Sequence, residues 1–372
     1  MHIGISIAKN NNAASELLKR FECSLSCLNS VIYLFLNSPT ATRRNAIKRI
    51  CKLHGQPILG LLSTTLPLIP WHRNNMSLLD QFSLKGKTAV VTGGARGLGL
   101  EMMRAFAEVG ASVACIDVLP ELGKHSVNDI HRDFGVLATT WECDVTDDEQ
   151  VRTTFDAIAK KHGSINVLVT AAGVVKNFRA EQYPAADFRR LMDVNVNGTF
   201  FCAQAAGNHM IAQATGGSII LIASMSGSIV NRPQPQCAYN ASKGAVIMLA
   251  KSLATEWAPR GIRVNSLSPG YMETGLTKAL FEKEGENGPV LKATWEGHTP
   301  IGRIGKPHEL KAMAVYLASS ASSFVTGELS DSDGRGERVR WGMRRGRGRG
   351  AKMEDLMKSG EVVRATTDGC NW

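Results

Sequence analysis

The chain of 372 residues lacks three features that would each indicate a class of protein. Its apolar runs, such as residues 31–36 and 58–62, fall far short of the ~20 apolar residues that a membrane-spanning helix needs, so no membrane span is expected. Its eight cysteines include no C-x-x-C pair and its nine histidines are dispersed, so no metal site is expected. Scattered thiols are typical of a reducing compartment such as the cytoplasm.

Acidic residues are scarce at both ends of the chain. Residues 1–75 hold nine Lys/Arg and two Glu, and residues 335–372 hold ten Lys/Arg and five acids, whereas the middle is close to neutral. The basic pI of about 9.3 therefore belongs to the ends and says little about what the middle binds. Residues 1–75 have the composition of a mitochondrial transit peptide or a disordered extension.

The Arg/Gly run at residues 344–350 is of low complexity and is typical of a disordered tail. Binding of RNA is the alternative, but no aromatic stacking platform accompanies the run. No nucleic-acid partner is therefore expected.

From residue 84 onward, short apolar runs alternate with helix-patterned segments. The apolar runs lie at 88–91, 112–116, 137–142, 166–170, 218–223 and 263–268, and the helical patterns at 98–109, 151–161, 188–210, 239–257 and 309–318. Continuous apolar strands separated by helices predict a parallel sheet covered on both faces. Right-handed crossovers then give a doubly wound, Rossmann-type α/β fold, in a single domain over residues 76–334, with ligands at the carboxyl ends of the strands.

A glycine-rich segment follows the first predicted strand and precedes a predicted helix. Residues 92–99 read Thr-Gly-Gly-Ala-Arg-Gly-Leu-Gly. Gly93 would permit the tight turn, Gly97 the close approach of backbone to a pyrophosphate, and Gly99 the packing of the helix on the strand. The alternative is an ordinary glycine-rich turn, but the strand and helix context favours a dinucleotide site.

An acid closes the second predicted strand. Asp117 lies about 20 residues beyond the glycines, where a carboxylate can accept hydrogen bonds from the adenosine ribose. Its charge would repel a 2′-phosphate, which favours NAD over NADP. Arg96, in the glycine turn, offers a cation to such a phosphate and keeps NADP open as the alternative.

Tyr239 and Lys243 lie four residues apart at the start of an apolar, helix-patterned run, so their side chains share one helix face. A phenol with a pKa near ~10 is a poor acid or base at neutral pH, and a neighbouring ammonium lowers that pKa. An isolated pair of this kind is usually a packed ring beside a solvated amine. In the company of the glycine segment it becomes a plausible proton-transfer device.

These motifs, with Asn195 in segment 193–198 and Ser224 after the fifth apolar run, resemble the short-chain dehydrogenase/reductase family over residues 84–334. The resemblance implies that Ser224 donates a hydrogen bond to the substrate oxygen and that Tyr239 moves its proton. Lys243 would lower the pKa of Tyr239 and bind the nicotinamide ribose, and Asn195 would hold a water in a proton relay.

The catalytic serine has two rivals in the same loop. Ser224 lies fifteen residues before Tyr239, two more than is commonest in the family, and the surplus falls in the Pro-rich segment 231–236. Ser226 and Ser228 are therefore alternatives to Ser224.

The resemblance also implies which residues contact the cofactor, NAD or NADP. Asp144 and Val145 would hold the adenine ring, and segment 269–274 would contact the nicotinamide amide, with Thr274 as the hydroxyl. Residues 278–300 would form a mobile lid over the substrate. The full set of expected cofactor contacts is Gly93, Arg96, Gly97, Leu98, Gly99, Asp117, Asp144, Val145, Ala172, Gly173, Asn195, Tyr239, Lys243, Pro269, Gly270, Met272 and Thr274.

Two segments depart from the family pattern. Thr170 and Ala171 stand where the family has two asparagines, so Thr170 must steady the central sheet through its hydroxyl, or that role is absent. Residues 328–333 read Glu-Leu-Ser-Asp-Ser-Asp, which lacks the apolar content of a parallel strand. This segment is expected to pair weakly, as a soft edge beside the first strand.

The motifs look most like those of fungal oxidoreductases that act on polyols and sugar ketoses such as arabinitol, mannitol and xylulose. A small alcohol or ketone is thus the expected substrate. The alternatives are a reductase of a 3-oxoacyl group or a secondary-metabolite ketone, and a catalytically poor dinucleotide-binding scaffold. Family members commonly pair as homodimers or homotetramers.

Overall fold

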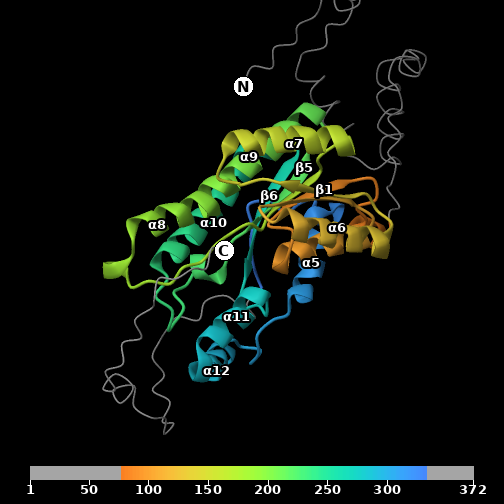
Figure 1. Ribbon diagram of the computed structural model, residues 1–372. Coiled ribbons are helices and arrows are strands. Elements are labelled where there is room, and N and C mark those ends of the chain that lie inside the picture. Colours follow the sequence, from red (N-terminus) through yellow and green to blue (C-terminus); the bar gives the residue numbers. More distant parts are fainter. Residues whose placement is uncertain (1–76, 333–372) are drawn as a thin grey trace, which may run out of the picture. The chain divides into compact units, whose positions relative to one another are not determined.

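The computed structural model describes residues 77–332, apart from the side chains of residues 276, 331 and 332 (Figure 1). The predictions for residues 1–75 and 335–372 therefore lie outside the described residues. Seven strands form one sheet in the order β3-β2-β1-β4-β5-β6-β7, and every pair of neighbours is parallel. The predicted doubly wound fold is confirmed.

The strands match the predicted apolar runs to within one or two residues at most ends. They are β1 (Thr88–Thr92), β2 (Ser112–Asp117), β3 (Ala138–Glu142), β4 (Val167–Thr170), β5 (Gly217–Ile222), β6 (Ile262–Pro269) and β7 (Leu329–Ser332). Both β1 and β4 are buried at every residue because helices cover both faces of the sheet. β1 pairs with β2 on one side and with β4 on the other. Strands before and after this point are therefore added in opposite directions, and the carboxyl end of β1 is the switch point of the sheet.

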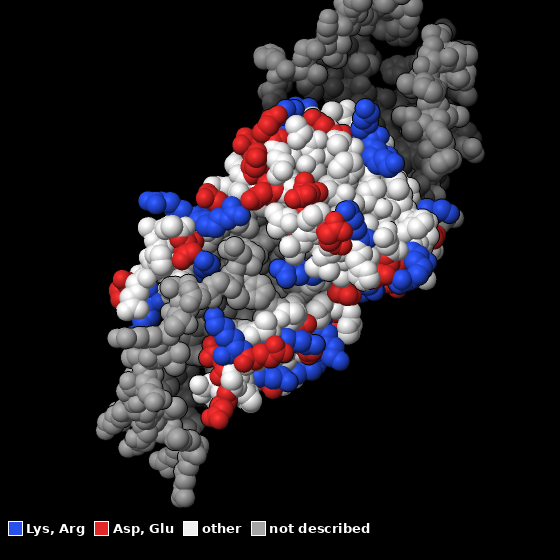
Figure 2. Space-filling model, in the orientation of Figure 1, with Lys and Arg blue, Asp and Glu red and all other residues white. Residues whose placement is uncertain are grey.

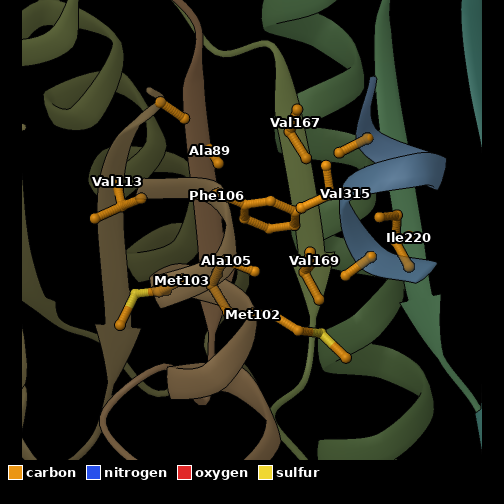
Figure 3. Close-up of a cluster of buried hydrophobic side chains, with 14 of the residues drawn as sticks. Ala89, Met102, Met103, Ala105, Phe106, Val113, Val167, Val169, Ile220 and Val315 are labelled. Atoms are coloured by element: carbon orange, nitrogen blue, oxygen red, sulfur yellow. The ribbon is translucent and has the colours of Figure 1, made fainter. Parts of the chain in front are cut away.

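Helices from different parts of the chain pack on the two faces of the sheet. One face carries α5 (Gly97–Glu108), α6 (Pro120–Phe134) and α13 (Lys311–Ala318), and the other carries α7 (Asp148–His162), α9 (Gly198–Gln213) and α10 (Cys237–Trp257). Phe106 of α5 packs between Val113 and Val167 of the sheet, close to Val315 of α13 (Figure 3). Successive residues of β1 belong to the hydrophobic clusters on opposite faces of the sheet. Ala89 lies in the same cluster as Phe106, and Val90 lies in the cluster on the other face.

Two helical regions differ from the predictions. The helix predicted at 188–210 is interrupted, because α8 (Ala185–Met192) passes through a π-helical turn at Asp193–Asn197 before α9 begins. Helix α6 is absent from the predicted elements because only Val127 and Ile130 are large buried apolar residues in it, too few for a clear helical period. π-Helical turns inside α-helices frequently occur at functional sites, and this one carries Asn195.

The last strand departs from one expectation. β7 pairs with β6, from Ser266 with Leu329 to Pro269 with Ser332, so the prediction that it lies beside the first strand is wrong. Despite its low apolar content the segment does join the parallel sheet, and the expectation that it pairs weakly stays a prediction. β7 is an edge strand with one neighbour, which leaves polar residues access to water. The segment is further held where Glu328 N–H donates to Asn265 Oδ1 at 3.1 Å.

The predicted lid is helical. α11 (Gly275–Lys283) and α12 (Gly288–His298) pack against each other and stand apart from the helices that cover the sheet (Figure 1). Among the helices within residues 77–332, none is both long enough and apolar enough to cross a membrane. On the face shown in Figure 2, basic and acidic side chains are interspersed.

Candidate active site

The glycine turn joins β1 to α5 at the carboxyl edge of the sheet. Gly93 has a φ of 65°, and a Cβ built there would lie 2.7 Å from the backbone nitrogen of Ala172. A Cβ at Gly99 would lie 2.2 Å from the carbonyl oxygen of Gly93, so only glycine lets the helix start this close to the turn. Gly97, with a φ of 60°, has open space where its Cβ would be. The turn therefore leaves room for a phosphate at the amino end of α5.

Asp117, at the end of β2, is held against this turn. Its Oδ2 accepts a hydrogen bond from Ala95 N–H at 3.1 Å and its Oδ1 one from Leu119 N–H at 3.2 Å. Burial raises the pKa of Asp117, while these hydrogen bonds and the charge of Arg96 oppose the rise. Arg96 is thus near enough to Asp117 to act on its carboxylate, and both cofactor preferences stay open.

The predicted adenine contacts lie after β3. Asp144 Oδ1 accepts from Thr146 N–H at 3.0 Å, and Asp144 Oδ2 accepts from Arg190 at 3.1 Å. Burial acts to raise the pKa of Asp144, but the hydrogen bonds from Thr146 and Arg190 outweigh it and lower the pKa. Val145 packs on α9, where a Cβ at Gly198 would lie 2.6 Å from its side chain. Arg190 was missed because no local pattern links it to a residue 46 positions earlier.

The predicted catalytic side chains meet between β5 and α10. Ser224, which follows β5, lies close enough to Tyr239 for its side chain to act to lower the pKa of the phenol. Lys243, only 5% exposed, lies one turn further along α10, and its Nζ donates to the carbonyl oxygen of Ile222 at 2.8 Å. The same Nζ lies 5.7 Å from the centroid of the Tyr239 ring. Ile222 was not predicted, because a backbone acceptor leaves no mark on the sequence.

Burial dominates the electrostatics of the pair. It raises the pKa of Tyr239, against a smaller opposing effect of the Ser224 side chain, and it lowers the pKa of Lys243 to about 8. The expected lowering of the Tyr239 pKa by Lys243 is therefore not found in this structure. Both groups lose hydration together, and a desolvated site disfavours charge on each of them.

Asn195 braces two parts of the site. Its side chain, fully buried in the π-helical turn, donates from Nδ2 to the carbonyl oxygen of Val174 at 2.9 Å and to Ser242 Oγ at 3.1 Å. Its Oδ1 accepts from Val174 N–H at 2.8 Å. A Cβ at Gly173 would lie 3.3 Å from Asn195 Oδ1 and 3.7 Å from Lys243 Nζ. The amide thus joins the segment after β4 to α10, directly beside Lys243.

Of the candidate serines, Ser224 is the one whose side chain acts on the pKa of Tyr239. Ser226 Oγ instead accepts from Asn231 Nδ2 at 2.8 Å and from Gln236 Nε2 at 3.0 Å, so it orders the loop. Sequence reasoning missed these two loop amides. Asn231 and Gln236 lie in a segment with two prolines, and this was the signal that could have found them. A polar side chain that is buried in such a turn needs a hydrogen-bond partner.

Thr170 does not replace the family's asparagine. Its Oγ1 is buried and has no hydrogen-bond partner among the described residues. Thr92 on the neighbouring strand makes the cross-strand contact instead, because its Oγ1 accepts from Ala172 N–H at 3.2 Å. Of the two outcomes considered for Thr170, the absence of the role is the one observed.

The segment after β6 faces the glycine turn across a cavity. Thr274 caps α11 by accepting from Thr277 N–H, and Met272 is buried. The cavity, of about 220 Å³, is lined by Gly97, Leu100, Glu101, Glu273, Thr274, Gly275, Pro307 and His308. Gly97 and Thr274 therefore line the same cavity. Within residues 77–332, no group of three or more His, Cys, Asp or Glu side chains is arranged to hold a metal ion.

Comparisons with known proteins agree with this geometry. The family model described as enoyl-(acyl carrier protein) reductase matches residues 93–334. The D-arabinitol 2-dehydrogenase (ribulose-forming) of Candida tropicalis is 42% identical over 277 residues, which cover 71% of this chain and 96% of the relative. A short-chain type dehydrogenase/reductase from Mycobacterium marinum superposes with a TM-score of 0.64 at 40% identity, covering 70% of this chain and 98% of the other. The chain belongs to the short-chain dehydrogenase/reductase family.

An NAD⁺-bound xylitol dehydrogenase structure also matches, with a TM-score of 0.64 and 33% identity, covering 68% of this chain and 99% of that one. The predicted family and the predicted class, an oxidoreductase, are confirmed by these matches. This short-chain dehydrogenase/reductase covers nearly the full length of these relatives, and the glycine turn, Tyr239 and Lys243 lie within the residues that the family model matches.

Proposed function

We propose that this enzyme transfers a hydride between a nicotinamide dinucleotide and a polyol or the corresponding sugar ketose. The observation that carries the proposal is the pairing of Tyr239 with the buried Lys243, whose Nζ lies 5.7 Å from the centroid of the Tyr239 ring, at the same sheet edge as the glycine turn. The names of two similar proteins, an arabinitol dehydrogenase and a xylitol dehydrogenase, support a polyol as the substrate.

Hydride transfer is the chemistry that bound NAD or NADP supplies. The side chains of this protein would manage the proton. Burial raises the pKa of Tyr239, so the phenol carries its proton at pH 7. It would give this proton to the oxygen of a ketone and take it back when the alcohol is oxidised. Ser224 would hydrogen-bond the same oxygen. Positioned proton transfer of this kind contributes ~10²–10⁴-fold to the rate.

Lys243 and Asn195 would support the proton transfer. With a pKa of about 8, Lys243 is largely protonated at pH 7, so its ammonium can donate to ribose hydroxyls. Asn195 would hold a water in a relay that refills the tyrosine proton. Its buried amide and its place beside Lys243 are consistent with that role.

Asp117 supports NAD as the cofactor, with NADP as the alternative if Arg96 pairs with a 2′-phosphate. We further propose that residues 76–334 are the catalytic domain and that the enzyme works in the cytoplasm as a homodimer or homotetramer, or in mitochondria if residues 1–75 are a transit peptide. The scaffold alternative was motivated by the polar last strand. β7 nevertheless pairs with β6, which counts against that alternative.

The test replaces only the titrating hydroxyl. Tyr239→Phe should lower the rate of polyol oxidation by at least ~100-fold, as loss of a proton-transfer group implies, while the Kd of NADH, measured by fluorescence titration, changes less than twofold. Tyr316→Phe, on α13, is the matched control and should alter neither quantity. Wild-type activity in Tyr239→Phe would refute the assignment.

The substrate class is tested with a panel of arabinitol, xylitol, ribulose and a 3-oxoacyl ester, followed by nicotinamide absorbance. We expect the largest kcat/KM with a polyol or ketose. Faster turnover of the oxoester would establish the alternative instead.

A further inference from the structure

Among the described side chains of the lid, one is buried and anchors it to the rest of the protein. Between residues 275 and 301, Trp295 is the only described side chain that is buried, with 4% of its surface exposed. The two chain segments that flank the lid are joined by a β-bridge between Met272 and Gly305, where Glu273 N–H donates to Gly305 O at 2.7 Å. A pair of helices with a closed base and one buried anchor depends on that anchor for its position.

Trp295 lies between two other aromatic rings. It stacks on Tyr271, with centroids 4.2 Å apart and planes 8° apart, and Phe281 of α11 meets it edge-on at 5.2 Å. Tyr271 belongs to the segment that follows β6, and Phe281 belongs to the lid. The indole therefore joins both lid helices to the segment that carries the predicted nicotinamide contacts.

A hydrogen bond extends this contact to the catalytic loop. With its amide oxygen turned toward the indole, Gln234 accepts from Trp295 Nε1–H at 2.8 Å. The same amide atom lies 3.4 Å from the hydroxyl oxygen of Tyr271. The opposite amide orientation would set two N–H donors against each other, so the oxygen faces the indole. Gln234 lies in the Pro-rich loop between Ser224 and Tyr239.

The loop itself is ordered on both sides of Gln234. Asn231 and Gln236 both donate to Ser226 Oγ, at 2.8 and 3.0 Å, and all three residues are buried. Because the loop is fixed at these two points, the side chain of Gln234 is held in position to accept the hydrogen bond from the lid. The position of α12 is thereby set against the segment that leads into Tyr239.

We propose that Gln234 and Trp295 form a latch that holds the lid closed over the site. Both are positioning residues, since they act through the lid and the loop. The inference rests on the proposed function in one respect, that the lid covers the substrate. If the closed lid is the state that retains substrate, weakening the latch lowers its population and raises the apparent KM for the alcohol by the same factor.

The first test needs no substrate. Full-length protein is treated with trypsin under native conditions, and cleavage after Lys278, Lys283 and Lys292 of the lid is followed by mass spectrometry. Trp295→Phe keeps the stacked ring but loses the N–H donor, so lid cleavage should rise about threefold to tenfold. Cleavage after Lys251, an exposed lysine of α10, reports global opening and should not change.

A second set of variants isolates the hydrogen bond. Gln234→Leu should speed lid cleavage as much as Trp295→Phe does, and the double variant should be no faster than either, because both remove one interaction. Gln234→Glu keeps an acceptor and should restore slow cleavage. Val290→Ala, at a lid position 65% exposed, is the matched control and should behave as the wild type.

The enzymatic test compares two constants, the KM for the polyol and the Kd of NADH. In Trp295→Phe and Gln234→Leu, the KM for the polyol should rise by the factor by which the closed population falls, while the Kd of NADH stays within twofold. Lid cleavage within twofold of the wild type in both variants, or additive effects in the double variant, would overturn the latch. Absence of turnover in the wild type would overturn the proposed function and leave the proteolysis result standing.

Discussion

Replacement of the buried Lys243 by methionine should stabilise the cofactor-free protein while removing its activity. Burial lowers the pKa of Lys243 from its ordinary 10.5 to about 8, which makes the charged amine about 3 kcal/mol less favourable in the folded than in the unfolded state. Lys243→Met removes this penalty, keeps a flexible apolar stem and loses the hydrogen bond to Ile222 O, worth about 1 kcal/mol. A net gain of about 2 kcal/mol at pH 7 is expected.

The sign of the pH dependence follows from the same shift. Because the pKa of Lys243 is lower in the folded state, the unfolded chain keeps a proton that the folded protein has released between pH 8 and 10.5. Wild-type stability should therefore rise with pH in this window, relative to Lys243→Met, by about 1.4 kcal/mol per pH unit at most. The advantage of the methionine variant should be nearly gone by about pH 9.5.

Urea unfolding at pH 7 and 9.5, without dinucleotide, measures both quantities. Lys251→Met is the matched control, because Lys251 is exposed on the same helix and should show no such difference between the two pH values. A Lys243→Met variant less stable than the wild type at pH 7, or an advantage independent of pH, would show that Lys243 is not desolvated as the structure implies.

Two further predictions concern the dinucleotide site. Gly99→Ala should lower both the free energy of unfolding and NADH affinity, because the new Cβ would lie 2.2 Å from the carbonyl oxygen of Gly93; unchanged values in urea unfolding and NADH titration would contradict the close packing. Asp117→Ser should raise the ratio of kcat/KM with NADP to that with NAD, since a charge that repels the 2′-phosphate is removed; a constant ratio would point to Arg96 as the group that sets the preference.

Several residues could be predicted because their chemistry is local. The glycines of the β1–α5 turn are required by the backbone itself. Two of them have a positive φ, and the third allows two backbone segments to come into van der Waals contact. Tyr239 and Lys243 share a helix face through their spacing alone. Ser224 was found from its place after an apolar run, which is where β5 ends.

The residues that were missed act across long distances in the chain. Arg190 reaches Asp144, Thr92 replaces the role expected of Thr170, and Gln234 reaches Trp295. None of these contacts follows from a period or a motif, because each depends on how two distant segments are packed together.

The sequence by itself determined the doubly wound sheet, the glycine turn and the Tyr239–Lys243 pair, because apolar period, glycine content and helical spacing are properties of neighbouring residues. Only the tertiary structure decided that burial raises the pKa of Tyr239, that a polar β7 pairs with β6, and that Trp295 anchors the lid. Desolvation, edge position and stacking arise from residues far apart in the chain, and packing alone brings those residues together.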